Sequence, residues 1–320
     1  MNAEIAMSAK PRSCPEELRA ALNSPVPSVR TPFTADGQVD FSGLRSQVDF
    51  LIAGKAKTLM LTWGDSVHSV MTDDEVAEVA RVVIEQTRGR AKVIAADNGW
   101  ATPKAVEFAK YCKQIGADLL MLLPPDWAGS TTQDTLVRHF SRVGEHMPTM
   151  LVTAFFLQSL GGGRAGSFQL EVVRALYERA HNLVAVKDDV VGDFGTNLCM
   201  ITHERWAVVS GGLMSNHMLQ IPYGVDGYLC LLMSYKPEIA WQYWDAVQSR
   251  DFDTAWRIIR EIEKPLVDCM CAVKGGYNAA VHGMAELFGI SPRHLPLPYH
   301  TMTDEEMEQF KGSLQGLGLL

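Results

Sequence analysis

The stretch LVAVKDD, residues 183–189, decides the fold of this chain. Four apolar residues run directly into a lysine and two aspartates, which is typical of a strand buried on both faces in a parallel sheet. The C-terminal ends of such strands are where α/β folds place their chemistry. We therefore expect Lys187 to lie at a functional site. The alternative is a lysine that leaves the sheet for solvent or pairs with Asp188 or Asp189, because a buried lysine needs a partner.

Seven further short apolar runs have the same character as this one, and helical patterns separate them. The other predicted strands cover residues 26–29, 58–61, 93–96, 119–123, 149–152, 206–209 and 227–230. The intervening helices are predicted at 41–52, 72–87, 102–115, 132–145 and 168–179, the second of which begins with a Thr-x-x-Glu capping box. Eight strands that alternate with helices favour an α/β fold of the (β/α)8 TIM-barrel type over an open sheet.

The chain divides into three parts around this pattern. Residues 1–24 read as an N-terminal tail with a short helix, and residues 25–236 as the (β/α)8 barrel. Residues 237–320 contain only helical patterns, at 237–249, 252–273, 277–288 and 303–314. They exceed what a barrel needs, so we interpret them as helices that complete the barrel and form a C-terminal helical extension.

Composition excludes several classes of function. The 320 residues carry a net charge of −8 with no basic patch, which argues against a nucleic-acid partner. No apolar run is long enough to cross a membrane, and the first fifteen residues lack the apolar core of a secretory signal. The six cysteines form no CxxC pair and the histidines no HxxxH motif, so we expect no metal, no cofactor and a cytoplasmic location.

The chain resembles the dihydrodipicolinate synthase / N-acetylneuraminate lyase family of Schiff-base aldolases and dehydratases. The motifs that carry the resemblance are TPF at 31–33, TWGD at 62–65, PP at 124–125, VAVK at 184–187, SGG at 210–212 and GVDG at 224–227. Their order and spacing cover nearly the whole chain from Val26 onward. The resemblance implies a TIM barrel in which Lys187 forms a Schiff base with pyruvate or a related 2-oxo acid.

The chemistry of an imine explains why a lysine stands at that place. An amine attacks a ketone only when it is neutral, and burial disfavours the charged form of a lysine. The imine nitrogen then draws electrons from C3 of the substrate, so aldol addition, retro-aldol cleavage and dehydration can all follow from one intermediate. The resemblance therefore implies a class I aldolase or a hydro-lyase that needs no cofactor.

The resemblance also implies which residues hold the substrate. Thr62 would supply a hydroxyl, and Trp63 and Gly64 backbone N–H groups, to the substrate carboxylate. The alternatives are a plain strand-end threonine and a core tryptophan. Asp65 stands where the family has a glutamate, and we count it with Lys187 among the candidate catalytic residues.

Three further substrate-binding candidates follow later in the chain. Arg164 stands near the position of a substrate-carboxylate arginine, with a solvated loop arginine as the alternative. Gly211 belongs to the SGG motif, and Leu229 lies where the family uses a backbone carbonyl of the eighth strand. The partner expected from these residues is a small 2-oxo acid, pyruvate or a bulkier analogue. We also expect a homo-oligomer, a dimer or tetramer as in the family, with the aromatic helix around Trp241 and Trp244 as a candidate interface or as outer packing of the barrel.

The chain departs from the family at the position of its proton-relaying tyrosine. Val152 takes that place at the end of the fifth predicted strand, and a valine cannot carry a proton. Two interpretations remain open. In the first, an active lyase relays protons through another group, such as Asp65, His68, Asp188 or a water. In the second, the chain is a catalytically impaired member that binds a 2-oxo acid and acts as a binding or regulatory protein.

Overall fold

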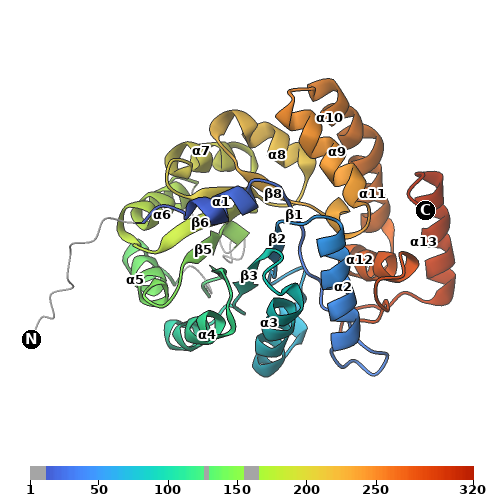
Figure 1. The fold of residues 1–320 in the computed structure, drawn as a ribbon, viewed down its shortest axis with the longest axis horizontal. Coiled ribbons are helices and arrows are strands. Elements are labelled where there is room, and N and C mark those ends of the chain that lie inside the picture. The colour runs from blue at the N-terminus through green and yellow to red at the C-terminus, as the bar shows by residue number, and fades with distance from the viewer. Residues whose placement is uncertain (1–11, 126–129, 155–165) are drawn as a thin grey trace, which may run out of the picture.

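A single eight-stranded parallel sheet forms the centre of the molecule (Figure 1). The computed structural model describes residues 12–125, 130–154 and 166–320. The strands are β1 (Pro25–Val26), β2 (Thr58–Met60), β3 (Lys92–Ala96), β4 (Leu119–Leu122), β5 (Thr149–Val152), β6 (Leu183–Asp188), β7 (Ala207–Ser210) and β8 (Gly227–Leu229). Their order is β1-β8-β7-β6-β5-β4-β3-β2. All eight predicted strands are confirmed, and with them the (β/α)8 barrel.

The sheet closes on itself between its first and second strands. The Val29 N–H donates to the Met60 carbonyl at 2.8 Å, and the Met60 N–H donates to the Pro27 carbonyl at 3.1 Å. Because these bonds join the two outer strands, the carboxyl ends of all eight strands meet around one axis. A residue that follows any strand therefore faces residues that follow the others.

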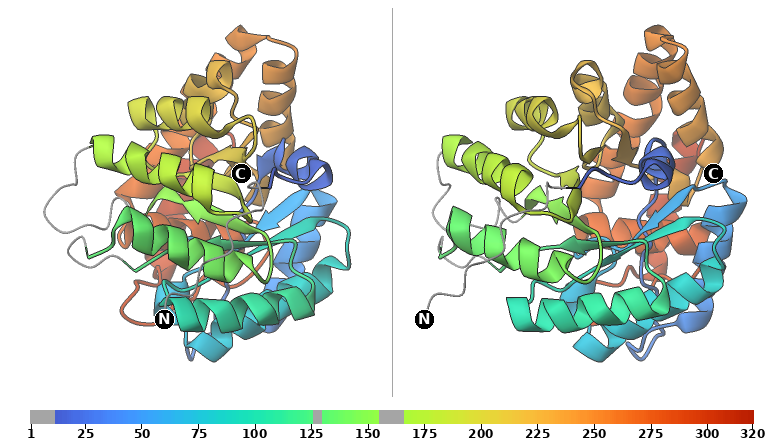
Figure 2. Two further views of the ribbon diagram at one scale, coloured as in Figure 1. Left: turned by 90° about the vertical axis from the view of Figure 1, so that its left-hand side faces the viewer. Right: turned by 60° about the vertical axis from the view of Figure 1, so that its left-hand side comes forward.

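Helices surround the barrel on its outer side, as the two turned views show (Figure 2). They are α2 (Phe41–Ala53), α3 (Asp73–Thr87), α4 (Thr102–Ile115), α5 (Gln133–Gly144), α6 (Gly166–Arg179), α7 (Gly192–Thr202) and α8 (Met214–Gln220). The capping box predicted at Thr72 is present, with the Thr72 side chain accepting the Glu75 N–H and Glu75 returning to the Thr72 N–H. The helices α7 and α8 were not located individually by the sequence patterns, because their apolar spacing is interrupted by glycine and polar residues.

The N-terminal segment contains a short helix that is packed against the barrel. Helix α1 (Glu16–Leu22) buries Leu18 and Leu22. Its Arg19 Nε lies 2.8 Å from Asp226 Oδ1, just before β8. Because helix α1 leads directly into β1, it covers the end of the barrel at which the strands begin, opposite their carboxyl ends.

The regular secondary structure of the C-terminal part, residues 237–320, is all helical. It contains α9 (Pro237–Gln248), α10 (Phe252–Ile258), a π-helical segment (Ile259–Glu263), α11 (Lys264–Ala272), α12 (Gly276–Leu287) and α13 (Asp304–Gly316), which gather on one side of the barrel in Figure 1. The sequence predicted one continuous helix over 252–273. The structure interrupts it with the π-helical segment, whose Glu263 accepts the backbone N–H groups of Met214 at 2.6 Å and Ser215 at 3.3 Å.

The aromatic side chains of α9 pack within this chain. Tyr243 and Trp244 are buried. The Trp241 indole donates to the Gly54 carbonyl at 2.9 Å, and the Lys57 ammonium lies 5.9 Å from the centre of its ring. Of the two interpretations of this helix, packing against the barrel is therefore the one observed, and these rings give no support to an intermolecular interface.

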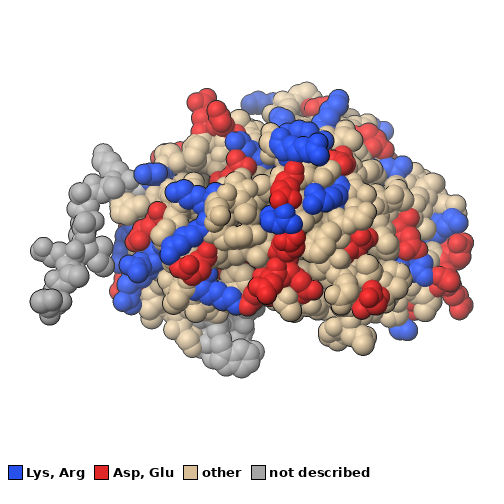
Figure 3. Space-filling model, turned by 60° about the horizontal axis from the view of Figure 1, so that its bottom comes forward, with Lys and Arg blue, Asp and Glu red and all other residues tan. Residues whose placement is uncertain are grey.

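The surface charges are mixed, and the cysteines are unpaired. On the face shown in Figure 3, basic and acidic side chains are interspersed. All six cysteines are free thiols. Within the part of the chain that the structure describes, no helix combines the length and apolarity needed to cross a bilayer.

Candidate active site

A cavity of about 380 Å³ lies at the carboxyl ends of the strands. Every strand contributes to it with a residue at or just beyond its end. These residues are Arg30, Thr62, Asp97, Leu123, Val152, Lys187, Gly211 and Leu229. Closure of the barrel thus brings together side chains that are far apart in the sequence, at the place where such barrels carry out their chemistry.

Lys187 points into this cavity and is held by a carboxylate. Its side chain is buried, and its Nζ donates to Asp189 Oδ1 in a close ion pair. In the strand register Lys187 lies beside Val152 on β5 and Val209 on β7. Val152, at the position of the family's tyrosine, is therefore next to the lysine, and the carboxylate that reaches the amine comes from the lysine's own strand.

The neighbouring Asp188 is directed away from the lysine. Its carboxylate accepts hydrogen bonds from Thr153 Oγ1 at 3.0 Å and from Gln220 Nε2 at 2.7 Å. Burial raises the pKa of Asp188, while these bonds and the N–H of Val191 act to lower it. Asp188 thus serves to join β5, β6 and α8. Of the two aspartates considered from the sequence, Asp189 is the partner of Lys187.

Gly211 makes room for this ion pair. A Cβ atom at residue 211 would overlap both Asp189 Oδ1 and the Asp188 carbonyl oxygen. The Gly211 N–H donates to that same carbonyl at 2.6 Å, which keeps the two chain segments close. The second glycine, Gly212, has a φ of +83° that favours glycine. The candidate role of Gly211 is therefore to let Asp189 approach Lys187.

The loop after β2 presents a hydroxyl and a carboxylate to the cavity. Thr62 Oγ1 accepts the Asp65 N–H at 2.9 Å, so its own proton is directed elsewhere and remains available to a ligand. The Thr62 N–H donates to Ser66 Oγ at 2.9 Å, which fixes the loop. Trp63 is 38% exposed, which excludes the alternative that it is a core aromatic. Trp63 and Gly64 line the same cavity.

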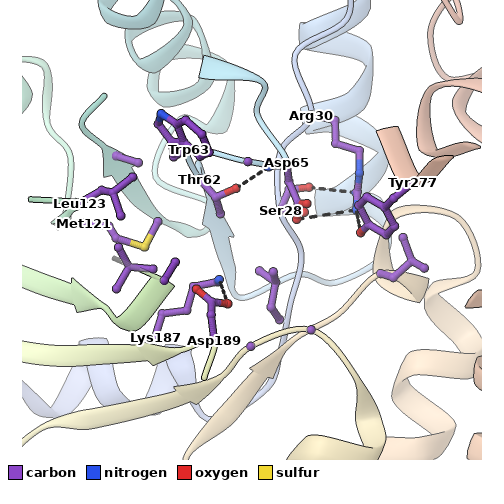
Figure 4. A pocket seen from close by; sticks show the side chains of 18 of the residues that line it. Ser28, Arg30, Thr62, Trp63, Asp65, Met121, Leu123, Lys187, Asp189 and Tyr277 are labelled. Atoms are coloured by element: carbon purple, nitrogen blue, oxygen red, sulfur yellow. Dashed lines mark hydrogen bonds and ion pairs between the residues drawn. The ribbon is translucent and has the colours of Figure 1, made fainter. Parts of the chain in front are cut away.

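A second cation lies on the opposite side of the cavity from Lys187, as Figure 4 shows. The Arg30 guanidinium is buried and donates to Ser234 Oγ at 2.8 Å and to Tyr277 Oη at 3.2 Å. Its Nη2 lies 3.9 Å from Asp65 Oδ2. Tyr277 enters from the start of α12, so the C-terminal helices supply part of the cavity wall.

A third carboxylate in the wall has no cation beside it among the described residues. Asp97 is 1% exposed, and its Oδ1 accepts the Leu123 N–H at 2.9 Å. Its Oδ2 is buried without a hydrogen-bond partner. Burial raises the pKa of Asp97 to about 7, against the smaller effect of its backbone hydrogen bonds. His68 contacts the Asp97 carbonyl at 3.4 Å and does not line the cavity, so it is a poor candidate for proton transfer.

Most of the sequence-predicted residues therefore lie around one cavity. Lys187, Asp65, Thr62, Trp63, Gly64, Gly211 and Leu229 all line it. Arg164 lies outside the described residues. The sequence analysis missed Arg30, Asp97 and Tyr277. Asp97 directly follows β3, and Arg30 directly follows the strand predicted at 26–29, so the argument used for Lys187 could have found both. Nothing in the sequence placed Tyr277 here.

Among the described residues, no group of three or more histidine, cysteine or acidic side chains is arranged to hold a metal ion. The site is instead built from a lysine, an arginine and three carboxylates at the mouth of a barrel. Fold and site together define a (β/α)8-barrel protein with a lysine-centred cavity. More specifically, the chain belongs to the dihydrodipicolinate synthetase family, whose model matches residues 22–317.

Relatives in this family are synthases and dehydratases. The chain is 28% identical to a probable 5-dehydro-4-deoxyglucarate dehydratase of Bradyrhizobium sp. strain BTAi1, over 95% of each chain. It is 26% identical to a 4-hydroxy-tetrahydrodipicolinate synthase of Methanococcus vannielii, over 92% of this chain and 98% of the relative. The likeness to this dehydratase and this synthase spans almost the entire chain.

Solved structures show the same fold. Dihydrodipicolinate synthase from Oceanobacillus iheyensis superimposes with a TM-score of 0.80 at 18% identity, over 95% of this chain and 99% of that one. YagE, a prophage protein of the same family from E. coli K12 solved in complex with pyruvate, gives a TM-score of 0.79 at 22% identity, over 93% and 99% of the two chains. At these identities the likeness concerns the fold.

Proposed function

We propose that this protein is a class I aldolase or hydro-lyase that forms a Schiff base between Lys187 and C2 of pyruvate or a related 2-oxo acid. The observation that carries the proposal is the buried Lys187 amine, directed into the cavity and paired with Asp189. The family membership and the relatives' names support a lyase. In this arrangement Thr62, with the N–H groups of Trp63 and Gly64, receives the substrate carboxylate.

Asp189 performs the proton transfers for which the family uses its tyrosine. It takes a proton from the Lys187 ammonium, and the neutral amine then adds to the C2 carbonyl. Asp189 gives this proton to the new alkoxide and takes one from the attached nitrogen, which leaves a neutral carbinolamine and a protonated Asp189. The protonated Asp189 returns its proton to the departing hydroxyl, which leaves as water and yields the iminium. The carboxylate is thereby regenerated. The close contact of Asp189 with Nζ provides this path, whereas Val152 provides none.

The reaction is tested by trapping the imine. The protein is incubated with pyruvate and a panel of other 2-oxo acids, and borohydride reduces any imine to a stable secondary amine. We expect a mass increase of one reduced adduct per chain, which peptide mapping assigns to Lys187. Lys187→Ala should lose this adduct. Lys104→Ala serves as the matched control, because that lysine lies on the surface and pairs with Asp73.

The alternative function is a binding or regulatory protein, and the observation that favours it is Val152 beside Lys187. It predicts a folded protein that binds 2-oxo acids but leaves Lys187 unmodified by borohydride across the whole panel. That outcome would replace the lyase proposal. Adduct formation at Lys187 alone would exclude an inert site.

We also propose that the protein assembles as a homo-oligomer, as expected from its family. Because the rings of α9 are used internally, the contact must be made by another surface. Light scattering should give a mass of two or four times 35.3 kDa. A monomer at micromolar concentration would contradict this expectation.

A further inference from the structure

The turn after β6 brings the Asp189 carboxylate to the Lys187 amine (Figure 4). Three buried side chains outside the cavity hold this turn, and we call them the anchor set: Thr153, Asp188 and Gln220. Each of them is at most 1% exposed, and none lines the cavity. They come from the end of β5, the end of β6 and the end of α8.

Three consecutive N–H groups of the turn point to two oxygen atoms of the anchor set. The Asp189 N–H donates to Thr153 Oγ1 at 2.8 Å. The N–H groups of Val190 and Val191 donate to Asp188 Oδ1 at 3.1 and 3.2 Å. The Thr153 hydroxyl donates to that same oxygen. The backbone that carries Asp189 is therefore fixed by side chains at the ends of β5 and β6.

The Asp188 carboxylate is itself held from the side of the helices. Gln220 Nε2 donates to its other oxygen, Oδ2, at 2.7 Å. A Cβ atom at residue 195 would overlap both atoms of this bond, so Gly195 leaves the space in which the bond forms. Because both oxygens of a fully buried carboxylate accept hydrogen bonds, a rotation of Asp188 would leave buried donors without partners.

Val191 shows that the turn is held against its own conformational preference. Its φ is +54° and its ψ is −161°, a region of backbone conformation that is populated essentially by glycine alone. The Val191 side chain is only partly buried, so packing compensates little of this strain. A strained residue persists only where its surroundings over-determine the backbone, and the hydrogen bonds to the anchor set provide that constraint.

We propose that the anchor set positions Asp189 for imine formation by holding its carboxylate against the Lys187 amine. The inference rests on the proposed function and names the residues that keep its proton path in place. They act through Asp189 and do not touch the substrate. A displacement of a reacting group by about 1 Å can cost about 100-fold in rate, so a change in the anchor set should be felt in the cavity.

The first test removes one oxygen atom from the anchor set. Thr153→Val keeps the branched shape of the side chain but cannot accept the Asp189 N–H. We expect the rate constant of imine formation with pyruvate, measured by rapid-quench borohydride trapping, to fall about 10- to 100-fold. The half-saturating pyruvate concentration should change little. Thr153→Ser restores the oxygen and should recover most of the rate.

The same strand offers a matched control. Thr149 is also fully buried on β5, but it stands at the other end of the strand and does not line the cavity. Its hydroxyl donates to the Asn182 carbonyl, which also accepts the Thr149 N–H. Thr149→Val is therefore the same substitution in the same strand, and it should leave the rate constant of imine formation unchanged.

A double-mutant cycle shows whether Thr153 acts through Asp189. Asp189→Asn already lacks the proton acceptor, so adding Thr153→Val to it should lower the rate constant no more than about twofold. Asp188→Asn separates positioning from proton transfer. It still accepts the N–H groups of the turn, and its amide can donate to Gln220 Oε1, which has no partner among the described residues. Its rate constant should stay within about threefold of wild type.

The two proposals fail in different ways. If wild-type protein gives no adduct at Lys187, the proposed function is wrong. If the adduct forms but Thr153→Val reacts at the wild-type rate, or loses as much in the Asp189→Asn background as it does alone, the anchor set does not position Asp189. A loss in Asp188→Asn as large as that in Asp189→Asn would make Asp188 a proton carrier and would also overturn the proposal.

A second variant keeps the proposal testable if Thr153→Val does not fold. Val191→Gly adopts the observed backbone conformation without strain but gives the turn more freedom. We expect its Tm to rise by about 2–4 °C, because a strained residue is relieved. Imine formation should slow about three- to tenfold, because Asp189 is held less firmly. A wild-type rate constant in Val191→Gly would overturn the proposal.

Discussion

Two cation–carboxylate pairs line the same cavity, and they differ in what their cations can do. Lys187 and Asp189 are in close contact and stand two residues apart on one strand end. Arg30 and Asp65 come from different strands, lie 3.9 Å apart, and the arginine has other partners in Ser234 and Tyr277. An ammonium can give up its proton to a neighbouring carboxylate, whereas a guanidinium remains charged in proteins.

This difference separates reaction from recognition. In the first pair the carboxylate can take the proton that the amine must lose before it attacks a carbonyl. In the second pair no proton can move, so its use is limited to hydrogen bonds and charge. On the proposed function, the cavity has a reactive side around Lys187 and a binding side around Arg30.

Replacing Lys187 by arginine, so that both pairs consist of an arginine and a carboxylate, should have the largest effect on activity. Lys187→Arg keeps the positive charge beside Asp189 but removes the proposed nucleophile. We expect no borohydride-trapped adduct and a loss of turnover on the order of 10⁴-fold or more. Intact-protein mass spectrometry and kcat measure the two effects. Lys104→Arg should behave as wild type, and adduct formation in Lys187→Arg would show that another lysine is the nucleophile.

Removing the proton acceptor from the reactive pair should have the next largest effect. Asp189→Asn keeps the size of the side chain but cannot accept the ammonium proton, so imine formation should slow about 10²- to 10⁴-fold. Rapid-quench trapping gives the rate constant, and Asp189→Glu should recover part of it. The control Asp193→Asn alters an exposed aspartate at the start of α7. A wild-type rate in Asp189→Asn would assign proton transfer to a different group.

A change beside the binding pair should alter affinity more than rate. Thr62→Val removes the hydroxyl that accepts the Asp65 N–H and is available to the substrate carboxylate. Loss of one charge-assisted hydrogen bond, about 1.5–3 kcal/mol, should raise the half-saturating pyruvate concentration about 10- to 100-fold. The limiting rate of adduct formation should change less. Thr62→Ser retains the hydroxyl and should remain near wild type; equal affinities of the valine and serine variants would place the carboxylate site elsewhere.

The unpaired carboxylate of Asp97 should affect stability most and activity least. In the folded protein burial raises its pKa to about 7, above the ordinary value of 3.8 that holds in the unfolded chain. Between these two values the folded state binds more protons, so the stability contributed by this group falls as the pH rises from 4 to 7. Asp97→Asn has no charge to bury. We compare the free energy of unfolding of Asp97→Asn with that of the wild type, measured by urea unfolding. We expect this difference to be about 1–2 kcal/mol more in favour of the variant at pH 8 than at pH 4.5.

If Asp97→Asn instead lost stability relative to the wild type between pH 4.5 and pH 8, other groups would compensate the charge of Asp97 in the folded protein. Glu263 provides an internal comparison, because burial also raises its pKa to about 7 although it accepts two backbone N–H groups. Its replacement by glutamine should weaken the cap of α8 as well as remove the charge. The two variants therefore distinguish a pH effect of burial from one of lost hydrogen bonds.

The sequence was sufficient for the barrel, because short apolar runs such as 183–186 are hard to read as anything but buried parallel strands. It was also sufficient to place Lys187 and Thr62 at strand ends. It could not choose between Asp188 and Asp189, since one residue's difference decides whether a side chain faces the cavity or the helices. Nor could it place Tyr277, which lies 48 residues beyond Leu229, the last residue of β8, and reaches the cavity through the packing of the C-terminal helices.

The cavity is therefore the joint product of two segments of the chain. Tyr277 and Val267 close one wall from α12 and α11, and Glu263 ties the same segment to the start of α8 behind the loop of Gly211. Exchanging strand-end loops with a relative is a common way to transplant specificity between barrels. In this protein such a graft would leave out the wall formed by Val267 and Tyr277, unless the helices after residue 237 were transferred with it.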